Sequence, residues 1–429
     1  MNAPFRRGAC PGLSAPMQTG DGLLVRLLPL GTISLAAFTA LCAAARAHGN
    51  GVVEVTVRGS IQVRGLSPAS APRFAAAVAA LGIAATDGIA VHAGPLAGLD
   101  PTEILDAEKL AADVRRALAG HALAGKIAPK ISVAVDGGGA LGLDGLSADV
   151  RLRAEPKSDR AVLALSVGGD SAGAEHIGFV APEDAAAAVV SLLEVMARRG
   201  REVRARDVLA ADGTYRFKSA IGELLLDGDL ELDSRLREKA PKSVIGRHRL
   251  RDGAFGCGVG LAFGHADATS LWKLVEAAAA SGATGLRAAP DRALIFLGFP
   301  PATLSAFATD AEQFGFIVRA DDPRRFVLAC AGAPICASAH IAARALAPRI
   351  ATDCAHMLSG GFNIHVTGCA KGCACPGRAA LTVVGTAEGC GLVADGTARD
   401  APFATVQTDE LPAAIARFAG EMTGEARHV

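Results

Sequence analysis

The sequence predicts an α/β (α+β) protein built from two copies of one unit, related by a pseudo-twofold axis. Three observations predict this class. Similar segments recur at an offset of 233 residues, and short apolar runs alternate with alanine-rich helical stretches. Of the 429 residues, 51% are apolar and only 4% are aromatic, which is a globular composition. A chain of this length can bury a sizeable core, and each copy is long enough for two subdomains.

The first copy opens with an apolar run over residues 22–30 that contains Arg26 and predicts a strand. Ser34 is a suitable N-cap for the alanine-rich helix that follows and ends before His48. Residues 23–47 are the one stretch that could be mistaken for a membrane span. Two arginines, a proline and a glycine interrupt that stretch, so a strand followed by a helix is predicted instead.

The same elements recur in the second half of the chain. Residues 65–68 (GLSP) correspond to residues 298–301 (GFPP), and the helices that follow end at equivalent positions. The shift also places Ser34 on Asp267, which is another good N-cap residue. Each copy is therefore predicted to open with strand, helix, strand, strand and helix.

The later parts of the two copies correspond as well. Three matches extend the repeat: residues 130–138 with 363–371, residues 148–152 with 381–385, and a late helix after Pro182 with another after Thr408. The first of these pairs predicts a strand that runs into a glycine loop in both copies. The charged stretch over residues 233–241 is the predicted linker. A pocket is expected where the two halves meet, because equivalent strands can face each other across the axis.

The charges of the chain exclude two classes of partner. Lys and Arg together number 43, as do Asp and Glu, so no global field favours nucleic acid or an acidic membrane surface. Residues 1–8 carry charge but are not followed by the apolar core of an export signal. We therefore expect a cytoplasmic protein whose thiols are reduced.

Four cysteines in the last quarter of the chain carry the clearest chemical signal. Cys330 and Cys336 form a C-x5-C pair, and Cys369 and Cys373 form a C-x3-C pair inside a loop of small residues. Four thiolates are the usual ligands of a 4Fe-4S cluster, and the spacing differs from the C-x2-C of zinc ribbons and bacterial ferredoxins. A zinc site, disulfides or buried thiols are the alternatives.

The first copy lacks these four thiols. Its equivalent positions are occupied by Ala97, Glu103, Asp136 and Ala140. If Cys369 and Cys373 only packed in a core, apolar residues would be expected at both equivalent positions, but Asp136 lies in a glycine loop. One copy is therefore expected to hold the metal while the other supports it.

These features together resemble the nitrite and sulfite reductase superfamily and, within it, the precorrin-3B synthases of aerobic cobalamin biosynthesis. Three segments carry the closer resemblance over essentially the whole chain: residues 7–13 (RGACPGL), 17–27 (MQTGDGLLVRL) and 368–374 (GCAKGCA). The reductases have asparagine where this chain has Lys371, and their last cysteine bridges the cluster to siroheme. The substitution favours an enzyme that treats a metal-free precorrin as substrate.

The resemblance implies a nitrite/sulfite reductase-like fold with four domains. These are a ferredoxin-like half-domain at 1–85, a reductase-like α/β domain without cluster cysteines at 86–235, a second ferredoxin-like half-domain at 236–320, and a 4Fe-4S-binding α/β domain at 321–429.

The resemblance also implies site residues. A Thr-x-Arg-x-x-x-Gln segment presents an arginine to the tetrapyrrole, and here it places Arg58, Gln62 and Arg64 on one face of a single strand. Lys130 matches a lysine that precedes the first glycine loop. Arg58 and Lys130 are the expected catalytic residues. The expected substrate-binding residues are Arg58, Gln62, Arg64, Lys130 and Lys371, because guanidinium and ammonium groups suit carboxylate-rich precorrins.

The implied reaction is an oxygen-dependent hydroxylation of precorrin-3A with formation of a γ-lactone, catalysed by a monooxygenase. The alternatives are a siroheme-dependent sulfite or nitrite reductase and a non-catalytic iron-sulfur electron carrier. The family also uses a mononuclear non-haem iron, for which His340, His356 and His365 are candidate ligands, although a lone histidine is more often structural. Electrons are expected from NAD(P)H through a partner reductase or ferredoxin, because the glycine-rich residues 256–260 are a weak dinucleotide motif.

Overall fold

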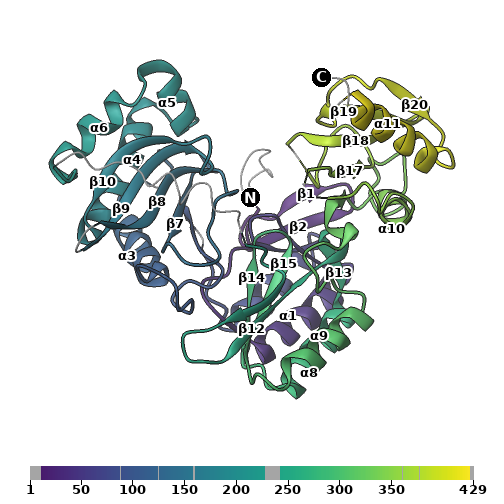
Figure 1. Ribbon diagram of the computed structural model, residues 1–429, viewed down its shortest axis with the longest axis horizontal. Helices are drawn as coiled ribbons and strands as arrows, with labels where there is room; N and C mark the ends of the chain where they lie inside the picture. Colours follow the sequence, from purple (N-terminus) through teal and green to yellow (C-terminus); the bar gives the residue numbers. More distant parts are fainter. Residues whose placement is uncertain are drawn as a thin grey trace.

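The computed structural model describes residues 11–425 except 87, 124, 158–159, 228–241, 360 and 376. The predicted linker at 233–241 and Cys10 lie outside the described residues. The described chain forms four five-stranded sheets, two in each copy of the repeat. Figure 1 shows the two smaller sheets together, in purple and green, with a larger domain on each side, one blue to teal and the other yellow.

The two smaller units contain the same elements in the same order. In the first copy these are β1 (Met17–Thr19), β2 (Gly22–Leu27), β3 (Ile33–Ser34), α1 (Leu35–His48), β4 (Val52–Val55), β5 (Ile61–Leu66) and α2 (Ala71–Ala79). In the second copy they are β11 (Gly246–Arg249), β12 (Phe255–Gly260), β13 (His265–Asp267), α8 (Ala268–Ala280), β14 (Gly285–Ala289), β15 (Ala293–Phe299) and α9 (Leu304–Gln313). The predicted duplication is confirmed in this part of the chain.

Both predicted N-caps are confirmed. The Ser34 hydroxyl accepts a hydrogen bond from the Ala37 N–H at 3.2 Å at the start of α1. At the equivalent position, the Asp267 carboxylate accepts from the N–H groups of Thr269 and Ser270 at the start of α8. Each cap stabilises its helix by about 1 kcal/mol, because it satisfies donors that have no partner within the helix.

The two copies exchange a short strand. β13 of the second copy pairs with β4 of the first, with Asp267 opposite Val52. β3 of the first copy pairs with β14 of the second in the same register, with Ser34 opposite Gly285. The sheets therefore run β1-β2-β5-β4-β13 and β11-β12-β15-β14-β3. Because each copy completes the sheet of the other, the two ferredoxin-like halves form one structural unit.

A single hydrophobic core joins these halves. It contains Phe38 and Leu41 of α1 together with Leu271 and Leu274 of α8, all fully buried. Each such side chain contributes about 1.5–3 kcal/mol of burial free energy. The helices lie on the side of the sheets away from the two larger domains (Figure 1). The opposite face of the first sheet carries polar residues, whereas that of the second sheet packs in a smaller apolar cluster.

The larger domains also share one topology. The first contains β6 (Ala90–Ala93), α3 (Ala107–Ala119), β7 (Ser132–Asp136), β8 (Ala148–Lys157), β9 (Arg160–Gly169), β10 (Glu175–Val180), α4 (Ala185–Arg199), α5 (Ala205–Asp212) and α6 (Tyr215–Ile221). The second contains β16 (Val327–Ala329), α10 (Ala343–Asp353), β17 (Ile364–Thr367), β18 (Ala379–Thr386), β19 (Gly389–Gly396), β20 (Ala404–Val406) and α11 (Leu411–Glu425). In each sheet three neighbouring strands are parallel and the remaining pairs are antiparallel.

The stretch at 23–47 forms β2, β3 and most of α1, as the interrupted apolar pattern predicted. Across the ranges that the structure describes, no helix is both long and apolar enough to cross a membrane.

We predict an acid-dependent loss of stability from His92 on β6. His92 is 7% exposed, and burial together with the charges of Arg58 and Arg115 lowers its pKa from 6.5 to about 4. In the unfolded chain His92 therefore takes up a proton below about pH 6.5, whereas in the folded chain it does so only below about pH 4. Between pH 7 and pH 5, urea unfolding should show a loss of about 2 kcal/mol from this residue. The His92→Gln variant should lose less stability over this range than the wild type. Equal slopes for the two proteins would contradict the assignment.

Candidate functional site

A cavity of about 280 Å³ lies between the first small sheet and the cysteine-bearing segments of the last domain. Its wall combines charged side chains with two of the four predicted cluster cysteines. The residues that matter below are Arg26, Glu54, Arg58, Gln62, Arg64, Arg292, Cys330 and Cys373. The cavity therefore draws on both copies, as expected for a pocket at the junction of the halves.

The predicted cysteines gather at one edge of the last sheet. Cys330 directly follows β16, and Cys369 and Cys373 follow β17, its parallel neighbour, so both loops leave from the carboxyl ends of adjacent strands. The Gly368 N–H donates a hydrogen bond to the Cys330 Sγ at 3.1 Å. Burial and the negative charges of Cys330, Cys369 and Cys336 raise the pKa of the Cys373 thiol, while Arg64 opposes this. The other three predicted ligands thus lie near enough to act on the Cys373 thiol.

The alternatives for these thiols can be compared with the geometry. All nine cysteines within the described ranges are free thiols, which excludes disulfides among them. Among the described residues, no group of three or more His, Cys, Asp or Glu side chains is arranged to hold a metal ion. A single zinc ion would need such convergence. A 4Fe-4S cluster distributes its thiolates over different iron atoms, so it suits a wider arrangement of sulfurs.

Buried and half-buried arginines lie around the cysteine loops. The charge of Cys373 acts on Arg64, that of Cys330 acts on Arg344, and that of Cys375 acts on Arg292. The Arg292 guanidinium also donates to the Ala374 carbonyl at 3.3 Å. Cations in these positions favour thiolates over thiols and would offset the negative charge of a thiolate-bound cluster.

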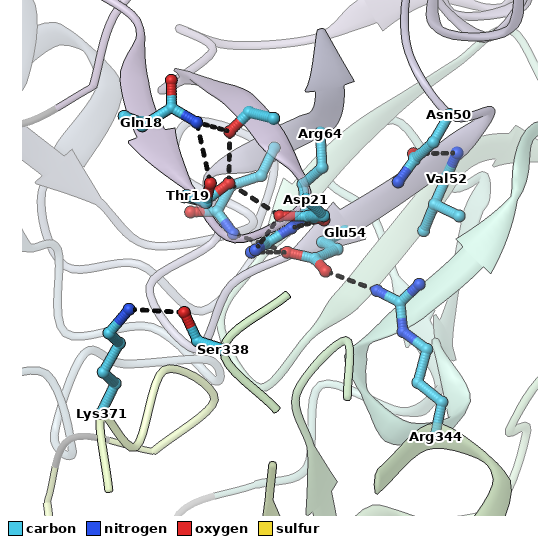
Figure 2. Close-up of polar contacts among 12 residues, drawn as sticks. Gln18, Thr19, Asp21, Asn50, Val52, Glu54, Arg64, Ser338, Arg344 and Lys371 are labelled. Carbon is cyan, nitrogen blue, oxygen red and sulfur yellow. Dashed lines mark hydrogen bonds and ion pairs between the residues drawn. The ribbon is translucent and has the colours of Figure 1, made fainter. Parts of the chain in front are cut away.

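Carboxylates of the first small domain hold two of these arginines (Figure 2). Arg64 donates to both carboxylate oxygens of Asp21, at 2.8 and 2.7 Å, and lies 3.6 Å from Glu54. Arg344 of α10 reaches Glu54 at 2.8 Å from the other side. Although burial opposes its charge, the hydrogen bond to Asp21 and the charges of Glu54, Asp21 and Cys373 raise the pKa of Arg64. This network ties the cysteine domain to the first sheet.

The structure places the predicted substrate residues in two settings. Gln62 and Arg64 lie on β5 and line the cavity, as expected. Arg58 also lines the cavity, but its expected place on the same strand is wrong, because it occupies the turn between β4 and β5. There it forms an isolated β-bridge with Pro290 of the equivalent turn in the second copy. Arg58 is therefore exposed at the contact between the two copies, not on a strand face.

The two predicted lysines lie outside the wall of this cavity. Lys130 is exposed just before β7. Lys371 is exposed in the loop between Cys369 and Cys373, and its ammonium group donates to the Ser338 hydroxyl at 2.9 Å (Figure 2). Their roles in substrate binding stay predictions.

The candidate histidines do not converge. His340 and His356 are exposed, whereas His365 on β17 is fully buried. Neither ring nitrogen of His365 has a hydrogen-bond partner in the protein, and burial with the charge of Arg292 lowers its pKa to about 4. It lies behind the cysteine loop, where its ring is 3.6 Å from the position of a Cβ on Gly372.

The first copy uses its glycine loop differently. Asp136, which replaces Cys369, is buried and accepts hydrogen bonds from the N–H groups of Gly138 and Leu143. Burial raises its pKa. The Asp136 carboxylate thus stabilises the glycine loop through hydrogen bonds from the loop's own backbone. This explains why the loop keeps its fold without the thiol.

Sequence reasoning missed several cavity residues. Arg26 on β2 lies opposite Gln62 of β5 and donates to its side-chain oxygen at 2.8 Å. Gln62 in turn donates to Glu54 at 2.9 Å. An arginine inside an apolar strand was the available signal for Arg26. Arg292 and Arg344 carried no comparable signal, because only the packing of distant elements brings them to the cavity.

Comparisons with known proteins agree with this geometry. A model of the nitrite/sulfite reductase ferredoxin-like half domain matches residues 15–81. Over 419 residues, the chain is 38% identical to a precorrin-3B synthase from Sinorhizobium sp, a match that covers 97% of this chain and 89% of that protein. The chain belongs to the precorrin-3B synthase family. Membership confirms the predicted superfamily. It also identifies the protein as an enzyme from a superfamily of oxidoreductases.

Sulfite reductases are more distant from this precorrin-3B synthase family member. The sulfite reductase (ferredoxin) of Mycobacterium tuberculosis is 27% identical over 143 residues, covering 32% of this chain and 26% of that protein. Sulfite reductase (ferredoxin) 2 of Mycolicibacterium paratuberculosis is 24% identical over 372 residues, covering 80% and 66%. The solved structure of the Mycobacterium tuberculosis NirA protein matches with a TM-score of 0.71 at 20% identity, covering 92% of this chain and 79% of NirA. The last likeness confirms the predicted fold.

Proposed function

We propose that this protein hydroxylates precorrin-3A with dioxygen and closes the ring-A acetate as a γ-lactone, which is the precorrin-3B synthase reaction. The single observation that carries the proposal is the 38% identity to a precorrin-3B synthase along 97% of the chain. The net change adds one oxygen atom to the substrate, and the second oxygen atom leaves as water with two electrons and two protons from a reductant.

Cys330, Cys336, Cys369 and Cys373 are the proposed ligands of a 4Fe-4S cluster. Three facts support the fit: a Cys373 thiol on which the other three cysteines act, adjacent guanidinium groups, and a glycine loop whose backbone N–H already donates to Cys330. Soft thiolates are the ligands that such clusters prefer. When bound, the cluster would supply single electrons to the adjoining cavity.

The cavity residues are proposed to bind and orient the acidic macrocycle. Arg64 forms an ion pair with Asp21, and Arg344 forms one with Glu54. Their main role is therefore to hold the cysteine domain against the first sheet. Arg58 and Arg292, on the wall and at the copy contact, are better placed to meet carboxylate arms of the substrate. Arg58 and Lys130 remain the proposed catalytic residues, with Gln62, Arg64 and Lys371 as further proposed contacts.

The remaining cofactors have less support in the fold. The mononuclear non-haem iron implied by the resemblance finds no fitting ligand set among the described residues, so no step is assigned to it. The glycine-rich residues 256–260 lie inside β12, paired on both sides, and therefore cannot act as a dinucleotide loop. Electrons are proposed to come from NAD(P)H through a partner reductase or ferredoxin, and a cytoplasmic location is proposed.

An isotope experiment tests the proposed function. The purified protein is incubated anaerobically with precorrin-3A and a reductant, and labelled dioxygen is then added. We expect mass analysis to find one labelled oxygen atom in the product, and the Arg58→Ala variant to form it at least tenfold more slowly, because a charge-assisted contact is lost. A siroheme absorption band with sulfite reduction, and no labelled product, would instead favour the reductase alternative.

A further inference from the structure

A second cavity of about 50 Å³ lies where the first large domain meets the small sheet of the second copy. Its polar wall consists of Arg58, His92, Glu108, Arg115 and Arg287. Arg58 also lines the larger cavity, so the two cavities share one side chain as a common wall. The small cavity uses none of the four cluster cysteines.

Positive charge is in excess in this small cavity. Among its described lining residues, Glu108 is the only acidic one, whereas three are arginines. Its carboxylate lies 3.3 Å from Arg115 and 4.0 Å from Arg287. His92 adds no charge near neutral pH, because its pKa is lowered to about 4 by burial and by Arg58 and Arg115. Glu103 and Asp106 also act on Arg287 from outside the lining, but the lining itself carries more arginines than acids.

Hydrogen bonds to backbone carbonyls and to one hydroxyl hold the two inner arginines in place. Arg287 is 9% exposed and donates to the Ala97 carbonyl at 2.8 Å and to the Thr32 hydroxyl at 3.1 Å. Arg115 donates to the Val91 carbonyl at 3.2 Å, while its buried Nε has no partner in the protein. Burial lowers the pKa of Arg287 despite the nearby acids, so an additional anion would relieve an existing electrostatic cost.

The internal repeat explains how this cavity arose. Arg287 on β14 stands 233 residues after Glu54 on β4, so the two occupy equivalent positions. In the first copy Glu54 meets Arg344 of α10 at 2.8 Å. In the second, the charges are reversed, since Arg287 faces Glu108 of the equivalent helix α3 at the looser distance of 4.0 Å. The position that carries the acidic Glu54 in one copy thus carries the basic Arg287 in the other.

We propose that this small cavity binds one carboxylate arm of the tetrapyrrole while the macrocycle occupies the neighbouring larger cavity. The inference rests on the proposed function and deepens it. A volume of about 50 Å³ admits a carboxylate group but not a ring, because a single water molecule already needs roughly 10–15 Å³ on the same measure. Guanidinium groups from two elements, Arg115 of α3 and Arg287 of β14, then orient the arm by charge-assisted hydrogen bonds.

Equilibrium binding of stable porphyrins tests the proposal in the purified, cluster-loaded protein. Uroporphyrin III carries both acetate and propionate arms, whereas coproporphyrin III has methyl groups in place of the acetates. Fluorescence titration of uroporphyrin III should show roughly tenfold to hundredfold weaker binding to Arg287→Gln and to Arg115→Gln than to the wild type. Arg287→Lys, which keeps the charge, should lose less. Arg116→Gln is the matched control, because Arg116 is the next residue on α3 and its side chain is 75% exposed.

The pattern across the two porphyrins identifies the arm. If the two Gln substitutions weaken uroporphyrin III only, the arm is an acetate; if they weaken both porphyrins, it is a propionate. Unchanged thermal unfolding and cluster absorbance show that a variant is intact, and the two variants act from different walls. Wild-type binding of uroporphyrin III with no loss in either variant would overturn this inference and leave the proposed function standing. No binding of either porphyrin by the wild type would overturn both.

Discussion

The Cys373→Ser variant is expected to lose its iron-sulfur cluster. Cys373 is one of the two cysteines at the cavity wall, and the charges of the other three proposed ligands act on its thiol. A serine hydroxyl is a harder donor that is rarely deprotonated near neutral pH, so it replaces a thiolate ligand poorly. Iron and acid-labile sulfide per chain should fall to a small fraction of the wild-type values, and formation of product should fall by at least a hundredfold.

Cys390→Ser is the matched control for this substitution. Cys390 is a buried thiol on β19 of the same domain, and its sulfur lies 3.8 Å from the Thr408 hydroxyl, which can bond a serine instead. We expect this control to keep its iron and sulfide. Full cluster occupancy in Cys373→Ser would refute the ligand assignment, whereas equal losses in both variants would point to unfolding of the domain.

Gly20→Ala should lower the cluster content although it replaces none of the proposed ligands. Gly20 lies in the turn between β1 and β2, and a Cβ atom there would stand 2.3 Å from the Cys336 sulfur and 3.4 Å from the Ala337 nitrogen. The Gly20 carbonyl also accepts a hydrogen bond from the Ala337 N–H at 3.0 Å. Because a sulfur bound to iron cannot move aside, the added methyl group must displace either the ligand or the N-terminal hairpin.

Iron content and thermal stability should distinguish these two responses. We expect iron per chain in Gly20→Ala to fall to half or less, with a loss of about 1–3 kcal/mol in the free energy of unfolding of the loaded protein. Gly12→Ala is the control, since a Cβ at Gly12 would meet no atom within 4 Å. Wild-type iron content and stability in Gly20→Ala would mean that the hairpin does not pack on the cluster segment as described.

Both predictions depend on contacts between the two ends of the chain. The N-terminal hairpin covers the Cys336 segment, and Arg64 and Glu54 of the first sheet hold Asp21 and Arg344 in one network. The cysteine-bearing domain is therefore positioned by the copy that lacks the four proposed ligands. That one copy holds the metal while the other supports it stays a prediction.

Local features of the fold were predictable because they depend on neighbouring residues. Ser34 and Asp267 are N-caps by virtue of side chains that reach donors two or three residues away. The glycine-rich residues 256–260 show the limit of such reasoning. They looked like a weak loop motif but form the interior of β12, because strand pairing on both sides satisfies their backbone groups.

Arg58 illustrates the same limit within the candidate site. Alternation with Gln62 and Arg64 predicted one strand face, but the β4–β5 turn begins before Arg58 and carries it to the contact with Pro290. The cysteine pairs were recognisable because ligand type and spacing are properties of the chain itself. Arg292 and Arg344 were not, since a single arginine has no local sequence pattern that shows where its side chain will lie.

The amino-acid order alone was enough to establish the duplication and the succession of strands and helices, and to single out the thiols that are proposed to bind a cluster. These follow from short-range propensities and from residue chemistry. Long-range packing alone decided the exchange of β3 and β13 between the copies, the reach of Arg344 to Glu54, and the cationic cavity around Arg287. These features join residues far apart in the chain, and their free energy comes from surfaces that meet only when both copies have folded.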